Sequence, residues 1–145
     1  MSAIRPCHVL VVEDNHGDAV LAQEAFREAG VLAALDIVRD GEQAIRYLEG
    51  VTPFAGRDRP DLILLDLKLP IMNGHEVLRA LKADPRFAAI PVLVLTTSTA
   101  ESDVSVAYEL HANSYLRKPI AFDDFVDLAR SIADYWLDMV VLPPA

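Results

Sequence analysis

The sequence is organised around residues 61–70, which read DLILLDLKLP. The apolar run of residues 62–65 is typical of a short strand that is buried on both faces. Asp66 follows this run directly, and Pro70 with Asn73 and Gly74 then predicts a turn. In an open parallel sheet, ligands bind beyond the carboxyl ends of the strands. Asp66 is therefore a candidate for chemistry as well as for capping the turn that follows it.

The same alternation of apolar runs and turns extends along the whole chain. Further strands are predicted at residues 8–12, 35–38, 90–95 and 114–117. A helical pattern follows each strand, beginning near residues 17, 42, 73, 102 and 122, and the last helix runs to about residue 139. This alternation predicts an α/β protein of three layers, a flavodoxin-like (βα)5 fold with a parallel five-stranded sheet. Right-handed crossovers then give the strand order 2-1-3-4-5.

Length and composition describe one globular domain. We expect residues 1–145 to form a single unit, with a core at about 8–139 and an apolar tail at 140–145. No apolar run is long enough to span a bilayer and no signal peptide is recognisable, so we expect a cytoplasmic protein. Cys7 is the only cysteine, which excludes an internal disulfide and a cysteine zinc cluster. The net charge of −9 argues against nucleic-acid binding.

Polar side chains follow four of the five predicted strands. Glu13 and Asp14 end the first strand, Asp66 the third, Thr96 the fourth and Lys118 the fifth. In the order 2-1-3-4-5 these strands are neighbours, so three carboxylates, a hydroxyl and an ammonium should meet at one edge of the sheet. Three carboxylates so close together repel each other unless a cation joins them. Hard oxygen ligands without His or Cys favour Mg²⁺.

Each of these residues also has an ordinary structural interpretation. Glu13 and Asp14 fit a turn and a helix cap, and the Thr96 hydroxyl could bond the backbone at its strand end. A single lysine such as Lys118 is usually a surface residue. Their coincidence at the ends of neighbouring strands favours a functional site.

The motifs resemble those of response-regulator receiver domains, the phosphorylatable half of bacterial two-component signalling. The resemblance covers residues 8–136 and rests on VVEDN, LLDLKLPIMNG, LTT and KP, which contain the strand-end residues named above. It implies that Asp66 is the phosphoacceptor, that Glu13 and Asp14 hold Mg²⁺ together with Asp66, and that Thr96 is the switch hydroxyl.

The resemblance further implies that Lys118 contacts the phosphate and that the peptide bond before Pro119 is cis. Tyr115 stands at the family's aromatic switch position, although a half-buried strand aromatic is an equally good interpretation of that residue.

A single-domain response regulator of this kind accepts its phosphoryl group from a sensor histidine kinase. Phosphorylation then switches a surface formed by the fourth helix, the fifth strand and the fifth helix. Because no DNA-binding module follows, we expect output by protein contact, dimer exchange or competition for phosphate. We expect no substrate turnover beyond self-phosphorylation and autodephosphorylation. The spacing EDN-x-GD at residues 13–18 and the long loop before Asp61 resemble the small regulators partnered with bacterial phytochromes.

Other functions of the same fold require different residues at these positions. An FMN electron carrier needs a Ser/Thr/Gly-rich phosphate loop after its first strand, where this chain has Glu13 and Asp14. A phosphatase with an Asp nucleophile needs a second Asp two residues further on, and His16 stands there. A phosphorylation-independent interaction domain remains the alternative, against which the intact acidic cluster argues.

The last predicted helix carries one apolar stripe that should face the sheet. Its members are Phe125, Leu128, Ile132, Tyr135 and Met139, with Trp136 at the margin. The apolar residues 140–142 extend beyond the sheet. They either fold back on their own domain or contribute to a homodimer interface.

Overall fold

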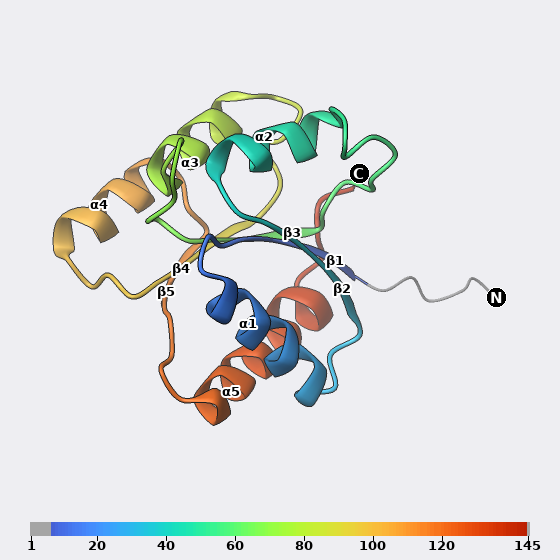
Figure 1. The fold of residues 1–145 in the computed structure, drawn as a ribbon, viewed down its shortest axis with the longest axis vertical. Helices are drawn as coiled ribbons and strands as arrows, with labels where there is room; N and C mark the ends of the chain where they lie inside the picture. The colour runs from blue at the N-terminus through green and yellow to red at the C-terminus, as the bar shows by residue number, and fades with distance from the viewer. Residues whose placement is uncertain (1–6, 145) are drawn as a thin grey trace.

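The computed structural model describes residues 7–144 and has the predicted three layers (Figure 1). A parallel sheet has the strand order β2-β1-β3-β4-β5, as the sequence predicts. Its strands are β1 (Cys7–Val12), β2 (Ala33–Val38), β3 (Leu62–Leu65), β4 (Val92–Thr96) and β5 (Ser114–Arg117). The helices are α1 (His16–Glu28), α2 (Gly41–Glu49), α3 (Gly74–Ala83), α4 (Glu101–Glu109) and α5 (Phe122–Ile132), followed by a π-helix, η1 (Ala133–Met139).

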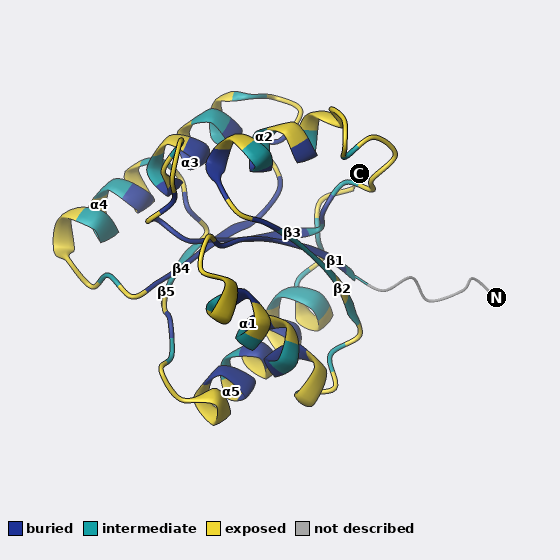
Figure 2. Ribbon diagram, viewed as in Figure 1, coloured by how far each residue is buried: buried dark blue, intermediate teal, exposed yellow. Residues whose placement is uncertain are grey.

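The helices divide between the two faces of the sheet. Helices α1 and α5 cover one face, and α2, α3 and α4 cover the other (Figure 1). Alternate residues of each central strand point to opposite faces, so Leu62 and Leu64 of β3 belong to the core beneath α1 and α5, while Ile63 and Leu65 belong to the core beneath the other three helices. The central strands are dark blue, or buried, along their length in Figure 2. Burial on both faces explains why residues 62–65 form an unbroken apolar run.

Local signals place the helix ends. The Asn15 side chain accepts a hydrogen bond from the Asp18 amide and caps α1, and Asp40 caps α2 in the same way through the Gln43 amide. Gly30, which follows α1, and Gly50, which follows α2, have φ values of 72° and 68°. Glycine reaches this left-handed conformation without the penalty that other residues incur.

The last helix differs from the prediction. The α-helical pattern ends at Ile132, and the Val140 amide donates to the Tyr135 carbonyl five residues earlier, as in a π-helix. The wider turn rotates the following side chains away from the predicted stripe. Tyr135 and Met139 are 55% and 74% exposed, whereas Trp136 packs against the core beneath α1 and α5. The predicted inward stripe is therefore wrong beyond Ile132.

The tail after η1 partly folds back on the domain. Pro143 lies beside Arg59 and Pro91 at the amino-terminal end of the sheet, while Val141 is 95% exposed. Within residues 7–144, no helix is both long and apolar enough to cross a membrane.

A polar cluster of His8, Asp36 and Tyr47 joins β1, β2 and α2. The Tyr47 hydroxyl donates to Asp36 Oδ2 at 2.5 Å and lies 2.7 Å from His8 Nε2. Burial by itself would raise the pKa of Asp36, but the hydrogen bonds from Tyr47 and His8 outweigh it and hold that pKa below its usual range. The cluster therefore contains an ionised carboxylate that its neighbours stabilise.

Candidate functional site

Backbone pairing brings the predicted site residues to one edge of the sheet. The Asp66 amide donates to the Val12 carbonyl at 3.1 Å, and the Lys118 amide donates to the Thr96 carbonyl at 2.8 Å. These bonds extend the parallel ladder by one residue beyond the strands, so the side chains that follow β1, β3, β4 and β5 emerge side by side. Glu13, Asp66, Thr96 and Lys118 are all buried.

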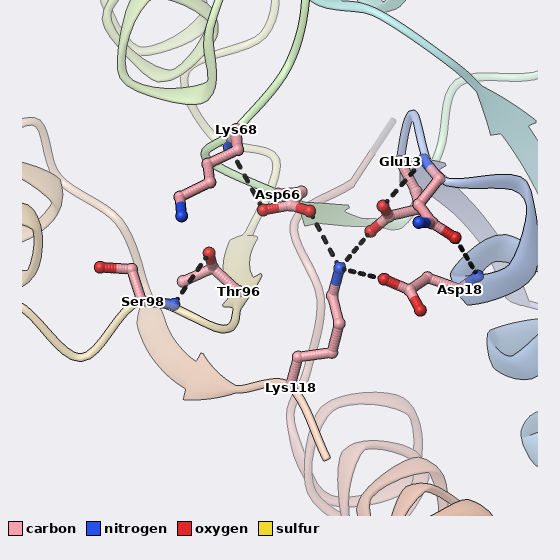
Figure 3. Close-up of polar contacts among 8 residues, drawn as sticks. Glu13, Asp18, Asp66, Lys68, Thr96, Ser98 and Lys118 are labelled. Atoms are coloured by element: carbon pink, nitrogen blue, oxygen red, sulfur yellow. Dashed lines mark hydrogen bonds and ion pairs between the residues drawn. The ribbon is translucent and has the colours of Figure 1, made fainter. Parts of the chain in front are cut away.

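The Lys118 ammonium lies at the centre of this group. Its Nζ is 2.7 Å from Glu13 Oε2, 2.9 Å from Asp66 Oδ2 and 3.0 Å from Asp18 Oδ2. Figure 3 shows the side chain reaching from the end of β5 to a point between these carboxylates. Burial would lower the pKa of Lys118, but the hydrogen bonds with the carboxylates outweigh it and raise that pKa, so the lysine is charged.

Sequence reasoning missed Asp18 as a member of the site. The sequence places Asp18 at the start of a helix and in the EDN-x-GD spacing, with no role at the site. In the structure the Asn15 side chain accepts a hydrogen bond from its amide at 2.9 Å. The signal available was its position in the first turn of a helix that begins directly after Glu13 and Asp14. Only the direction of that turn relative to β5 decides that its carboxylate reaches Lys118.

The predicted cis bond before Pro119 is wrong. Among residues 7–144 the cis peptide bond is Thr52–Pro53, and Lys118–Pro119 is not cis. A cis bond at this position would turn the Lys118 side chain back toward Asp66. The structure needs no such turn, because the Lys118 amide is paired with β4 and its long side chain spans the remaining distance to Asp66.

Three carboxylates at the site form a group that could hold a metal ion. One oxygen each from Glu13, Asp14 and Asp66 lie within 4.8 Å of one another, with Asp14 exposed and the other two buried. Burial raises the pKa of Glu13 to about 7 against the lowering effect of its Lys118 hydrogen bond, and the neighbouring Asp66 charge adds to the rise. A divalent cation would relieve this repulsion, and an all-oxygen donor set with one side open to water suits a hard ion. The residues present therefore fit the predicted metal.

The backbone that follows Asp66 is held by a close approach of α3. Asn73 and Glu76 form a capping box at the start of this helix, and the Gly74 amide donates to the Leu67 carbonyl at 2.9 Å. A Cβ added to Gly74 would lie 2.3 Å from the Asp66 carbonyl oxygen. The absence of a side chain at Gly74 therefore lets α3 begin against the residue that carries the central carboxylate.

Thr96 and Tyr115 are linked through the loop between β4 and α4. Thr96 is fully buried, and its Oγ1 accepts a long hydrogen bond of 3.4 Å from the Ser98 amide. Since β4 adjoins β3 on the side away from β1, Thr96 lies across Asp66 from Glu13 (Figure 3). The Tyr115 hydroxyl donates to the Ser98 carbonyl at 2.9 Å, and the Ser98 hydroxyl donates to Asp103 Oδ2 in α4 at 2.6 Å. Tyr115 is thus half-buried against the loop that follows Thr96.

Comparison with known proteins identifies a single family. The family model described as "Response regulator receiver domain" matches residues 9–130. The probable methanogenesis regulatory protein FilR2 of Methanothrix harundinacea is 44% identical over 94% of this chain and 88% of its own length. Response regulator Rcp1 of Synechocystis is 42% identical over 97% of this chain and 95% of its own length.

Two solved structures have the same fold over nearly the whole chain. The phosphorylated cyanobacterial phytochrome response regulator RcpA superposes with a TM-score of 0.90 at 40% identity, over 97% of this chain and 100% of its own. The Mn²⁺-bound form of Rcp1 superposes with a TM-score of 0.87 at 42% identity, over 96% of this chain and 100% of its own. One of these relatives carries a phosphoryl group and the other a divalent metal.

Proposed function

This chain belongs to the response regulator receiver family, and on that premise we propose that Asp66 accepts a phosphoryl group that switches a protein-interaction surface. The observation that carries the proposal is the buried Asp66 carboxylate at the end of β3, paired with Lys118 and grouped with Glu13 and Asp14. We propose that residues 8–139 form the receiver unit.

The reaction is an in-line phosphoryl transfer. An Asp66 carboxylate oxygen forms a bond to phosphorus while the bond from phosphorus to the donor breaks. For a phosphohistidine donor the released imidazole keeps the bonding electron pair and takes up a proton. Lys118 neutralises charge on the phosphoryl oxygens as they approach. The chain itself needs no proton acceptor, because a carboxylate attacks phosphorus through an oxygen that has no proton to lose.

A bound metal would occupy the group formed by Glu13, Asp14 and Asp66. We propose Mg²⁺, which retains water ligands that a phosphate oxygen can replace and which, when bound, neutralises charge on the transferred group. The Mn²⁺ in the structure of Rcp1 supports a divalent ion in this family.

The switch would run through Thr96, Ser98 and Tyr115. In the present structure the Thr96 hydroxyl oxygen accepts a long hydrogen bond of 3.4 Å from the Ser98 amide. A charged phosphoryl oxygen on Asp66 would give this hydroxyl a strong acceptor for its proton. Movement of Thr96 would shift the loop to which both Tyr115 and α4 are bonded. The surface formed by α4, β5 and α5 would change as a result.

A sensor histidine kinase would supply the phosphoryl group. Rcp1 and RcpA, the latter named as a phytochrome response regulator, support a kinase of the bacterial phytochrome type. Because such a kinase draws on ATP, we propose that this chain acts in the cytoplasm.

Intact-mass measurement after treatment with acetyl phosphate and Mg²⁺ tests the assignment. We expect one added phosphoryl group, which is lost with EDTA and in Asp66→Asn. The matched control is Asp127→Asn, which removes a carboxylate that is 74% exposed on α5 and should leave labelling intact. Undiminished labelling of Asp66→Asn would rule out Asp66, and no labelling of the wild type by acetyl phosphate or by a kinase would favour a phosphorylation-independent interaction domain.

We also propose that the chain forms a homodimer through the end of η1 and the tail. Tyr135, Met139 and Val141 are 55%, 74% and 95% exposed. Exposed apolar side chains close together in the chain often mark a protein contact. Sedimentation of the wild type should show a dimer, with and without beryllofluoride, and Met139→Asp should weaken it. The control Ile71→Asp replaces an apolar residue that is 75% exposed in the loop between β3 and α3. A monomer under both conditions would end this proposal.

A further inference from the structure

Asp18 is the most exposed of the three carboxylates that contact Lys118. Its side chain is 34% exposed, against 7% for Glu13 and 9% for Asp66. It lies in the first turn of α1, where the Asn15 side chain fixes its backbone amide. Its Oδ2 is 3.0 Å from the Lys118 ammonium.

The three contacts use all the hydrogen-bonding capacity of the lysine. An ammonium group has three N–H donors, and Glu13, Asp66 and Asp18 accept from it at 2.7, 2.9 and 3.0 Å. A phosphoryl oxygen on Asp66 can bond to Lys118 only if one of these carboxylates releases its hydrogen bond.

The burial of each carboxylate determines which hydrogen bond to Lys118 breaks most easily. Glu13 would lose a charge-assisted bond where little water can replace it, which is unfavourable for a buried charge. Asp66 carries the phosphoryl group, and its oxygen that is not phosphorylated can keep the hydrogen bond from Lys118. Asp18 can exchange the ammonium for water, because a third of its side chain is already exposed. Its contact with Lys118 is therefore the easiest of the three to break.

From this geometry, and on the basis of the proposed function, we propose that Asp18 is a positioning residue that competes with the incoming phosphoryl group for Lys118. While it is bound, it occupies the donor that the phosphoryl oxygen needs, and its charge repels an anionic phosphodonor. Asp18 thereby sets the donor concentration at which Asp66 is phosphorylated.

Release of Asp18 also breaks a contact between two elements of the fold. The contact joins α1 to the residue that follows β5, two segments separated by 100 positions in the chain. Phosphorylation breaks this salt bridge between Lys118 and the first turn of α1. Helix α1 therefore presents a different surface to partners before and after phosphoryl transfer.

Titration with beryllofluoride, a phosphoryl mimic, in saturating Mg²⁺ tests the competition. Amide NMR would follow binding to the full chain of the wild type, Asp18→Asn and Asp18→Glu. We expect the half-saturating concentration to fall about three- to tenfold in Asp18→Asn, the effect of one partly screened charge a few ångströms away. Asp18→Glu should restore the wild-type value, because it returns the carboxylate. With acetyl phosphate, Asp18→Asn should lower the apparent KM and leave the maximal rate within about twofold.

A matched control separates competition from a loss of helix stability. Asp123→Asn removes an exposed acidic residue from the first turn of α5, so it repeats the change in helix dipole without touching Lys118. We expect beryllofluoride binding of this variant to equal that of the wild type. In the wild type, the amides of residues 15–22 should shift on saturation, and Asp18→Asn should show part of that shift before any ligand is added.

Two results would overturn the proposal. Equal or weaker binding of beryllofluoride by Asp18→Asn would show that Asp18 does not compete for Lys118. A wild type that binds no beryllofluoride and accepts no phosphoryl group would instead refute the proposed function, and the role of Asp18 with it.

Discussion

Replacement of Gly74 by Ala should both destabilise the fold and displace Asp66. The added Cβ would lie 2.3 Å from the Asp66 carbonyl oxygen and 2.6 Å from the Leu67 Cα. Both are backbone atoms, so no side-chain rotation relieves the contact, and α3 must move away from β3 by about 1 Å to reach the separation of ordinary packing. Overpacking of this kind costs about 1–3 kcal/mol. The helix propensity of Ala recovers at most about 1 kcal/mol, so we expect a net loss of about 1 kcal/mol, and of about 2 kcal/mol where the overpacking lies at the top of its range.

Urea unfolding followed by circular dichroism measures that loss, and acetyl phosphate labelling measures the displacement of Asp66. A shift of about 1 Å in a reacting group can lower a rate by up to a hundredfold, so we expect labelling to slow at least tenfold. The control is Gly17→Ala in α1, where an added Cβ meets only the Asn15 side-chain oxygen at 3.2 Å. That variant should be at least as stable as the wild type, with a gain of at most about 1 kcal/mol from helix propensity, and its labelling should be unchanged. Wild-type stability and labelling in Gly74→Ala would refute the view that this close approach holds Asp66 in place.

Three further predictions follow from other parts of the fold. Trp136→Ala should lower the free energy of unfolding in urea by about 2 kcal/mol, and Tyr135→Ala by less than about 1 kcal/mol. The reverse order would mean that the α-helical stripe continues past Ile132. Ile71 has a φ of 68° and is 75% exposed, so Ile71→Asn should raise stability by about 1 kcal/mol, because Asn tolerates this conformation better than a β-branched residue; no gain would contradict the strain. The low pKa of Asp36 means that its ionised form adds stability above the unfolded pKa, and that this stability is lost as pH falls through the lower folded value. The Tm of the wild type should therefore fall more steeply below about pH 4 than the Tm of Asp36→Asn. Parallel curves of Tm against pH would exclude this linkage.

The apolar runs of the sequence determined the architecture. A strand between two layers of helices is buried on both faces, so it must be apolar at every position, and residues 62–65 can satisfy no other role in a parallel sheet. The strand order by itself also places the strand-end residues at one edge of the sheet. Glu13, Asp66 and Lys118 could be grouped from sequence because each is the first residue after its strand, and the backbone ladder alone brings such residues together.

Only the tertiary structure decided the contacts that depend on the direction of a helix or the width of a turn. Asp18 reaches Lys118 because α1 begins at a particular angle to β5, and no local pattern encodes that angle. The π-helical turn after Ile132 exposes Tyr135 and buries part of Trp136, a rotation that a period of 3.6 residues cannot predict. Gly74 reads in sequence as a turn residue, yet its place in the structure is a contact between backbones. Each of these features arises from packing between segments distant in the chain, whereas periodicity and turn chemistry report only on neighbours.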